Sequence, residues 1–210
     1  MKFLLLPLLF LLSAAVHPLA PAKNVTDDFH GIDFKNRSYP YRFSWGKHKR
    51  INVRLENGKY EYDFRDERGW FDLSHVYITD LTNDGRPEAI VMIWHVACGV
   101  SCDGGSALFC IYSFDHHRLK PLWQYETGDL AYGCGLKSFT AKRGTLTLEL
   151  FGRCSPWNRT ASSTGKSQIK DLTRVTLKSN GTRFVVRKRQ FVSVPERSVL
   201  NYEPQINVSK

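Results

Sequence analysis

Oxygen-bearing side chains recur at alternate positions of one short segment, residues 80–88. Calcium takes about six to eight oxygen ligands, and a loop that offers them at alternate positions can surround one ion. Gly85 would allow the sharp turn that such a loop needs. The ligands would be the side chains of Asp80, Thr82, Asp84 and Glu88 and the backbone carbonyl of Arg86. The segment therefore predicts a site for Ca²⁺, the one cofactor that the sequence suggests.

The same residues have a second interpretation that needs no metal. Asp80 and Asp84 can accept hydrogen bonds from nearby backbone amides, and Asp84-Gly85 is a common turn dipeptide. Thr82 stands where a third aspartate would strengthen a calcium site, so it lowers the negative charge of the loop. If calcium does bind, a closed cage of oxygen ligands leaves no position for a substrate. The ion would then hold the loop in place, and both interpretations stay open.

The segment also resembles a known motif. A strand, the pattern Asp-x-Asp-x-Asp-Gly-x-x-Asp and a second strand form the calcium-binding loops of FG-GAP and VCBS-type repeats in β-propellers. This chain departs from that pattern at Thr82 and Glu88 and carries it once. Residues 77–92 are also similar to single-copy loops in uncharacterised secreted bacterial proteins. The resemblance implies a Ca²⁺ loop between two strands, and it implies no activity.

Four of the five cysteines are predicted to form disulfides. We expect Cys134 to pair with Cys154 and Cys98 to pair with Cys102, leaving Cys110 as a buried thiol. If the strands are consecutive antiparallel neighbours, the loops that carry these cysteines lie at one end of the sheet, at residues 97–106, 127–134 and 152–167. Four cysteines allow three pairings, and a zinc site built from four thiolates is the alternative.

One loop combines an aromatic residue with two cations. Trp157 lies between Arg153 and Arg159 in a glycine-bounded segment, residues 152–165, and we interpret these three residues as a candidate ligand-binding site. The alternative is that Trp157 anchors the loop by packing on the end of the sheet. An inhibitor that presents residues 152–167 to a partner protein is a further possibility.

The sequence offers little for catalysis. It contains no nucleophile elbow, zinc-protease helix, phosphate-binding loop or dinucleotide glycine motif. Cys98 and His95 could form a nucleophile and base, but a disulfide cysteine near a strand-end histidine explains the same residues. We therefore lean away from an enzyme.

The elements that position these residues are predicted to be strands. We expect an all-β, mostly antiparallel sheet, either a sandwich or an open barrel with propeller-blade-like hairpins, and little helix. Asn57-Gly58 predicts a tight hairpin over residues 51–64 with Val53 opposite Tyr62. Asn180-Gly181 predicts a second hairpin with Leu177 opposite Phe184. Further strands are expected at 70–79, 88–96, 107–114, 121–126, 136–141 and 145–151.

Two of these strands differ in pattern. Residues 88–96 are apolar on both alternations, which predicts a central strand buried on both faces. Residues 145–151 alternate, which predicts that one face meets solvent. There is no internal repeat of about 20–50 residues, so a full propeller or solenoid is excluded.

The ends of the chain predict export. Residues 1–22 read as a cleavable signal peptide, since a lysine is followed by an apolar stretch and small residues. Residues 23–38 form a polar lead-in, 39–194 a single β domain and 195–210 a flexible tail. We expect the mature protein to be secreted or periplasmic.

The charge balance limits the partners. A 210-residue chain with 42% hydrophobic residues and a formal charge of +10 is an ordinary but basic globular protein, not a disordered, collagenous or multi-pass membrane protein. The basic field favours an anionic polymer, such as nucleic acid or a wall polymer, or anionic lipid head groups, and the alternative is that the charge only keeps the protein soluble. The densest basic run is Arg183, Arg187, Lys188 and Arg189. It lies in a strand pattern, so no sequence-specific nucleic-acid binding is expected. We also expect no membrane span, and a monomer.

These features favour a secreted binding or structural module of unidentified ligand, stiffened by one Ca²⁺. The alternative is an extracellular hydrolase with a site among the loops that carry cysteine and histidine.

Overall fold

The computed structural model describes residue 29 and residues 31–41, 51–64, 67–98, 102, 105–115, 118–130, 133–154, 168–198 and 204–209. The predicted signal peptide therefore lies outside the described residues, as do Trp157 and Arg159. The described chain is all-β and contains no α-helix, as the sequence predicted. It holds no helix long and apolar enough to cross a membrane.

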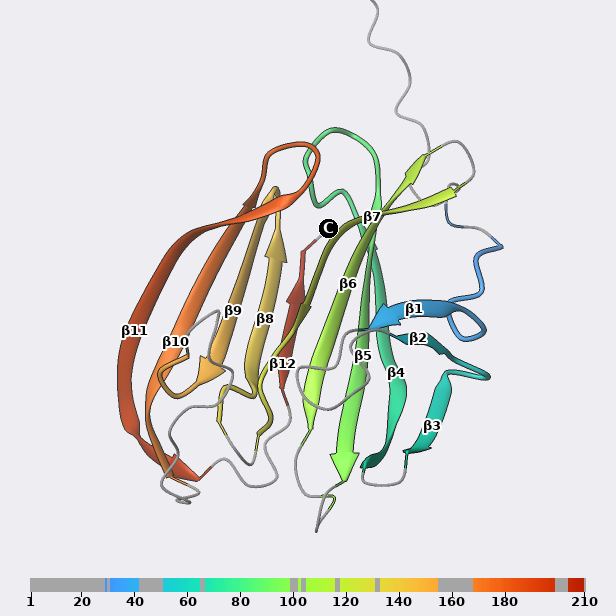
Figure 1. The fold of residues 1–210 in the computed structure, drawn as a ribbon. Coiled ribbons are helices and arrows are strands. Elements are labelled where there is room, and N and C mark those ends of the chain that lie inside the picture. The colour runs from blue at the N-terminus through green and yellow to red at the C-terminus, as the bar shows by residue number, and fades with distance from the viewer. Residues whose placement is uncertain are drawn as a thin grey trace, which may run out of the picture.

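The strands form three sheets (Figure 1). A two-stranded sheet contains β1 (Ser38–Tyr41) and β2 (Ile51–Arg54). We call the second the inner sheet: β3 (Lys59–Phe64), β4 (Glu67–Thr79), β5 (Glu88–Cys98), β6 (Ser106–Asp115) and β7 (Arg118–Glu126) in that order. We call the third the outer sheet, in the order β11-β10-β9-β8-β12: β8 (Leu136–Lys142), β9 (Thr145–Phe151), β10 (Gln168–Ser179), β11 (Phe184–Ser198) and β12 (Gln205–Val208).

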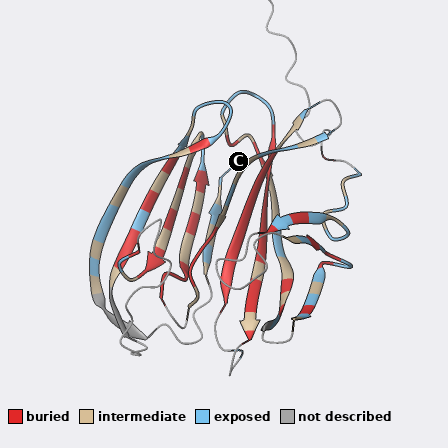
Figure 2. Ribbon diagram, in the orientation of Figure 1, coloured by how far each residue is buried: buried red, intermediate tan, exposed pale blue. Residues whose placement is uncertain are grey.

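The inner sheet is covered on both faces. One face packs on the outer sheet, where Ile90, Met92 and Phe109 share a core with Leu148 and Leu177. The other face packs on β1 and β2, and its core is a separate cluster. That cluster includes Val91, Ile93, Leu108, Tyr39 and Val53. β5 and β6 are buried along most of their length (Figure 2). This burial confirms the prediction that residues 88–96 form a central strand buried on both faces.

The outer sheet has one covered and one open face. In β9 the leucines Leu146 and Leu148 are buried, whereas Thr145, Thr147 and Glu149 on the alternate positions are partly exposed. This alternation confirms the prediction for the strand. The exposure is greatest at the edge strand β11, where Val186, Arg187, Lys188, Gln190, Phe191 and Ser193 are exposed (Figure 2).

The first predicted hairpin is wrong beyond its turn. Asn57 and Gly58 adopt positive φ values of 54° and 89°, and Glu56 and Lys59 exchange backbone hydrogen bonds of 2.8 and 3.1 Å. The two arms then separate, because β2 pairs with β1 and β3 pairs with β4. Val53 consequently lies opposite Tyr39, on a short strand that the sequence did not reveal.

The second predicted hairpin forms with a different register. β10 and β11 are joined by a four-residue loop, and Leu177 lies opposite Val186 instead of Phe184. The side chain of Asn180 accepts hydrogen bonds from the amides of Thr182 and Arg183 at 3.2 and 3.0 Å, which stabilises the longer loop. A register shift follows between Thr176 and Leu177, and Arg187 is the extra residue of a β-bulge.

Both ends of the predicted β domain extend further than expected. β1 begins at Ser38, the last residue of the predicted lead-in, and β11 continues to Ser198. Within the predicted flexible tail, β12 pairs in parallel with β8 and places Ile206 opposite Phe139. Ile206 and Val208 pack on the core between the sheets, and this burial explains why the segment is ordered as a strand.

Candidate functional site

The predicted calcium loop connects β4 to β5 and is held by its own hydrogen bonds. The buried carboxylate of Glu88 accepts bonds from the amides of Leu81 and Thr82 at 2.7 and 2.9 Å, and from the Thr82 hydroxyl at 3.1 Å. Asp80 accepts from the amides of Asp84 and Gly85, both at 3.1 Å. These are the local turns of the metal-free interpretation.

The carboxylates of the loop point at amides and not at a common centre. Asp84 accepts from the amide of Arg86 at 2.9 Å, so each predicted carboxylate ligand is engaged within the loop. Among the described residues, no three His, Cys, Asp or Glu side chains gather closely enough to hold a metal ion. The site at Asp80, Thr82, Asp84, Arg86 and Glu88 stays a prediction that calcium titration must test.

The loop also joins the two large sheets. The amide of Gly144, in the β8–β9 turn, donates to the carbonyl of Leu81, and the Gly144 carbonyl accepts from the amide of Ser179 at 3.0 Å. The Thr79 hydroxyl donates to the carbonyl of Ser209 at 3.1 Å. Burial raises the pKa of Glu88 to about 7, and the hydrogen bonds that the carboxylate accepts limit this rise. We call this loop, residues 80–88, the loop latch, because it links the two large sheets and contains the titratable carboxylate of Glu88.

Both predicted disulfides are present. Cys98 is bonded to Cys102 and Cys134 to Cys154, so the alternative of a four-thiolate zinc site is wrong. Cys110 is a buried free thiol, and burial raises its pKa to about 12, which leaves it protonated and unreactive. The bond between Cys98 and Cys102 also removes the thiol from the proposed pair of Cys98 and His95. Two disulfides are compatible with an extracellular or periplasmic location.

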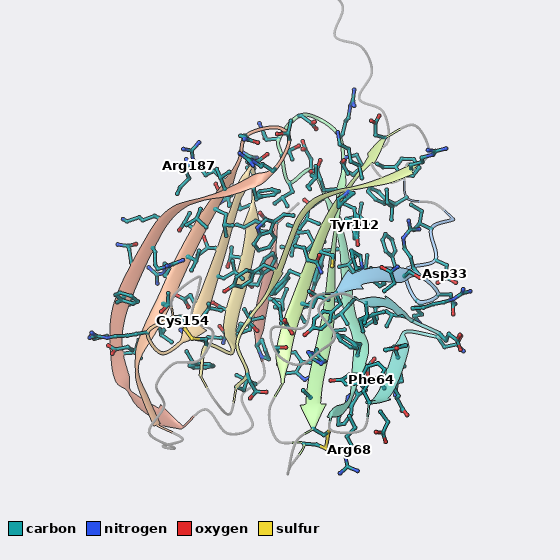
Figure 3. The ribbon with its side chains drawn as sticks, in the orientation of Figure 1. Asp33, Phe64, Arg68, Tyr112, Cys154 and Arg187 are labelled. Atoms are coloured by element: carbon teal, nitrogen blue, oxygen red, sulfur yellow. A yellow bond between two sulfur atoms is a disulfide. The ribbon has the colours of Figure 1, made fainter. Side chains whose placement is uncertain are left out.

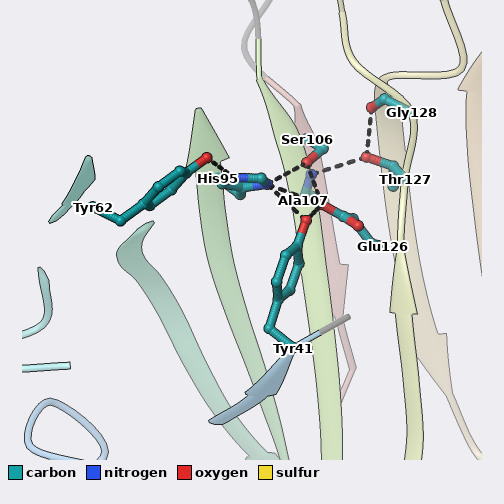
Figure 4. A network of polar contacts seen from close by, with 8 residues as sticks. All are labelled: Tyr41, Tyr62, His95, Ser106, Ala107, Glu126, Thr127 and Gly128. Carbon is teal, nitrogen blue, oxygen red and sulfur yellow. Dashed lines mark hydrogen bonds and ion pairs between the residues drawn. The ribbon is translucent and has the colours of Figure 1, made fainter. Parts of the chain in front are cut away.

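A network of buried polar side chains surrounds His95 and was not predicted (Figure 4). Glu126 Oε1 accepts from the hydroxyls of Tyr41 at 2.6 Å and Ser106 at 2.9 Å, and it lies 3.0 Å from His95 Nδ1. Tyr62 Oη lies 3.0 Å from His95 Nε2. The side chains come from β1, β3, β5, β6 and β7, and every one belongs to a buried residue.

The geometry of this network differs from that of a catalytic triad. In a triad the hydroxyl nucleophile and the carboxylate lie on opposite ring nitrogens. Here Ser106 Oγ and Glu126 are both on the Nδ1 side of His95, at 3.5 and 3.0 Å. An ionised carboxylate only accepts, so an ionised Glu126 pairs with a proton on Nδ1, the nitrogen that a triad histidine also turns to its carboxylate. The ring also stacks on Phe71, with centroids 4.2 Å apart. The network satisfies buried polar groups and ties five strands together.

The basic run lies on the exposed edge strand β11. Arg183 precedes the strand, and Arg187 and Lys188 are exposed within it. In the view of Figure 3, Arg187 projects away from the sheet at the border of the molecule. The run continues on the neighbouring strand with Arg174 and Lys178, which are also exposed. Arg174 bonds to Glu149 at 2.6 Å, whereas Lys178 and the cations of β11 form no ion pair with the described acidic residues.

Uncovered apolar side chains accompany these cations. Val186 and Phe191, both on β11, are the large hydrophobic residues that are exposed in the described chain, at 52% and 56% of their surface. The guanidinium group of Arg153 lies 5.8 Å above the Phe191 ring, and its Nε donates to Asp171 at 2.8 Å. Of the predicted ligand-binding set, Arg153 is thus placed beside β11, while Trp157 and Arg159 lie outside the described residues.

One nitrogen on this surface has no acceptor in the part of the chain that the structure describes. Arg189 Nε is buried and makes no hydrogen bond to the described residues. Arg189 lies opposite Val175 and is two residues from Phe191, so it belongs to the same face of β11 as that ring. The sequence signalled the charge of this strand but not its exposure, because exposure depends on which sheet edge the strand occupies.

Comparisons with protein-family models, with curated proteins and with solved structures found no match for this chain. Its function must therefore be inferred from its own residues. The buried network and the loop latch serve the fold, whereas the surface of β11 presents charge and apolar area to solvent.

Proposed function

We propose that this chain is an exported binding module for a polyanionic ligand and that β11 is the binding surface. The observation that carries the proposal is the coincidence, on one edge strand, of the basic run with the exposed Val186 and Phe191. Val186 and Phe191 are separated along the strand by the cations, so charged and apolar side chains are interspersed on this surface. Export is supported by the pattern of residues 1–22 and by the compatibility of the two disulfides with an oxidising compartment.

The charge distribution supports a ligand with many negative groups. Within β11 the cations Arg187, Lys188 and Arg189 are consecutive, and the strand has no acidic residue between Phe184 and Val194. A cluster of one sign attracts an opposite polymer and accelerates its encounter in a salt-dependent manner. Asp171 of β10 lies opposite Ser193 of β11. Its carboxylate accepts hydrogen bonds from Arg153 and Ser193.

Binding to heparin, a soluble polyanion, tests this function. We expect the protein to bind heparin at about 50 mM salt and to release it as salt is raised, because exposed charges are screened. Reversal of Arg187 and Lys188 to glutamate should weaken binding at least about tenfold. The matched control reverses Lys120 and Arg118, exposed on β7, and changes the net charge equally. Equal losses in both double variants would show that net charge, and not β11, is responsible.

Calcium is proposed as a stabiliser of the β4–β5 loop, in line with the resemblance to FG-GAP and VCBS-type loops. The support is chemical, since Asp80, Asp84 and Glu88 lie within nine residues of one loop that joins both large sheets. Calcium at about a hundred times its dissociation constant would add about 2.7 kcal/mol to the free energy of unfolding. Melting curves in millimolar calcium and in chelator test this, and coinciding curves contradict it.

A hydrolase is the second candidate, favoured by the hydroxyl, imidazole and carboxylate of the His95 network. The network is buried, and Ser106 and Glu126 both lie on the Nδ1 side of His95. Both features oppose a catalytic role. A fluorophosphonate probe, which labels activated serines, tests the candidate. Labelling of Ser106 in the folded protein, lost in Ser106→Ala, would favour the hydrolase over the binding module.

A further inference from the structure

The free edge of β11 is built to accept another strand. β11 pairs with β10 on one side, and none of the described strands pairs with its other side. After the bulge at Arg187, six consecutive residues from Lys188 to Ser193 pair regularly with Thr176 to Asp171. In such an antiparallel segment, alternate residues direct their N–H and C=O groups to the open edge. This row of backbone groups is a template for an extended chain.

The side chains around this edge point to an acidic occupant. Lys188 projects from the same face as Arg174, and Arg189 projects from the opposite face with Phe191. A strand laid along the edge would therefore meet cations on both faces. The carboxylates of such a strand would meet Lys188, on the face opposite Phe191. Alternating apolar side chains of the added strand would cover Phe191, which is 56% exposed.

A second copy of the chain fits this edge poorly. Antiparallel pairing of two β11 strands across a two-fold axis near Lys188 would bring Arg187, Lys188 and Arg189 of one copy beside the same cations of the other. In any register the pair would join two basic segments that have no acidic residue between Phe184 and Val194. Like charges on directly opposed strands are destabilising, and cationic edges are one way in which proteins prevent self-association. The same cations that oppose self-pairing attract a chain that carries carboxylates.

We infer that β11 binds an extended segment of an acidic polypeptide, with carboxylate and apolar side chains in alternation, by adding it as a sixth strand to the outer sheet. This inference rests on the proposed polyanion-binding function and names the partner of that surface. An anionic polysaccharide would neutralise the cations but would leave the backbone groups of the edge unpaired. Strand addition uses both the charges and the edge.

A labelled ten-residue peptide of alternating glutamate and valine is the probe. Fluorescence anisotropy would measure its binding to the full chain, and a second peptide with the same sequence would carry N-methyl groups on alternate residues. The methyl groups keep the charge and remove N–H donors, so we expect binding to weaken at least about tenfold if a strand is added. Because either set of alternate residues can face the edge, both N-methyl patterns are compared, and one of them should bind like the parent.

Hydrogen exchange supplies an independent readout. Binding of the parent peptide should slow the exchange of backbone amides within Lys188–Ser193, because amides on the open edge gain acceptors. Lys188→Glu should weaken the affinity for the parent peptide at least about tenfold, whereas Lys120→Glu on β7 should change this affinity less than about twofold. Circular dichroism and thermal melting would show that both variants fold.

The outcomes separate this inference from the proposed function. Heparin binding with equal affinities for the parent peptide and both N-methylated peptides would overturn strand addition and leave polyanion binding intact. Tight binding of the parent peptide with loss in one N-methyl pattern would support strand addition. Failure of both heparin and the peptide to bind the folded protein would overturn both proposals.

Discussion

The inner sheet and the outer sheet differ in where their polar side chains lie and in whether these side chains are hydrogen-bonded. In the inner sheet, Glu126 and His95 are buried and meet hydroxyl groups from Tyr41, Tyr62 and Ser106. In the outer sheet, the cations of β11 lie at the surface, and Arg189 Nε is buried without an acceptor among the described residues. Buried polar groups that are hydrogen-bonded specify a fold, whereas exposed cations attract ligands of opposite charge. The first region therefore stabilises the fold, and the second is the surface that we propose binds the ligand.

The largest expected effect on stability comes from removing the acceptor at the centre of the buried network in the inner sheet. Glu126→Ala removes, in a buried site, the shared acceptor of Tyr41 and Ser106 and the carboxylate beside His95 Nδ1. We expect a loss of about 3–5 kcal/mol in the free energy of unfolding, measured by urea denaturation. The matched control is Glu61→Ala, an exposed glutamate on β3 of the same sheet.

The control should stay within about 0.5 kcal/mol of the parent protein. Glu126→Gln should cost less than Glu126→Ala, because its carbonyl oxygen can still accept from Tyr41. If Glu126→Ala and Glu61→Ala are equally mild, the network does not stabilise the inner sheet, and the contrast between the sheets disappears.

The two disulfides sharpen the comparison, since one lies at each sheet. Cys134 and Cys154 are 20 residues apart and flank β8 and β9 of the outer sheet, whereas Cys98 and Cys102, at the end of β5, are 4 apart. A longer closed loop restricts the unfolded chain more, so replacing Cys134 and Cys154 by serine should cost about 2–4 kcal/mol. Replacing Cys98 and Cys102 should cost less. Chemical denaturation of both double variants measures this, and the reverse order would contradict the loop-length explanation.

Features that depend on neighbours in sequence were predictable. The apolar run of β5 and the alternation of β9 follow from local patterns, and the structure contains both. The two disulfides, also present, were expected from the order of neighbouring strands, although four cysteines allow three pairings. Asn57-Gly58 also gave the correct turn. The pairing beyond that turn failed because β1 competes for β2, and no local pattern shows which of two strands will be the partner.

Features that are assembled from distant segments could not be predicted from the sequence. Tyr41 and Glu126 are 85 residues apart and Tyr62 and His95 are 33 apart, so each appears in the sequence as a single polar residue in or beside an apolar strand. The one available signal was period-two alternation, which placed His95 on the same face as Val91 and Ile93. β12 was missed for a similar reason, because a four-residue strand is stabilised by the parallel partner β8 and not by its own pattern.

The latch between the sheets gives a smaller, pH-dependent effect. Burial raises the pKa of Glu88 from 4.5 to about 7, so the folded state holds this proton more tightly than the unfolded state does. The contribution of Glu88 therefore favours the folded state below about pH 4.5 and is lost as pH rises through about 7, by up to roughly 3 kcal/mol. In Glu88→Gln this part of the pH dependence should vanish.

Glutamine is a suitable replacement because its oxygen can accept from the amides of Leu81 and Thr82 while its NH₂ group donates to the Thr82 hydroxyl. Urea denaturation between pH 4.5 and 8 compares the parent protein with the variant. Identical pH profiles would mean that Glu88 does not titrate in this range. In the same variant, a calcium effect on melting should weaken, since an ionised ligand has been removed.

The smallest expected effect on stability distinguishes the two sheets most directly. Arg187 and Lys188 are exposed on β11 and make no ion pair with the described acidic residues, so their reversal to glutamate should change the free energy of unfolding by less than about 0.5 kcal/mol. The same double variant should lose heparin binding at least about tenfold. Glu126→Ala should show the opposite behaviour, with a large loss of stability and, under conditions where the protein remains folded, unchanged heparin binding. A molecule in which the buried polar side chains maintain the fold and the exposed ones contact the ligand must show this double dissociation. Parallel losses of stability and binding in either variant would mean that β11 is part of the folding core and not a binding surface.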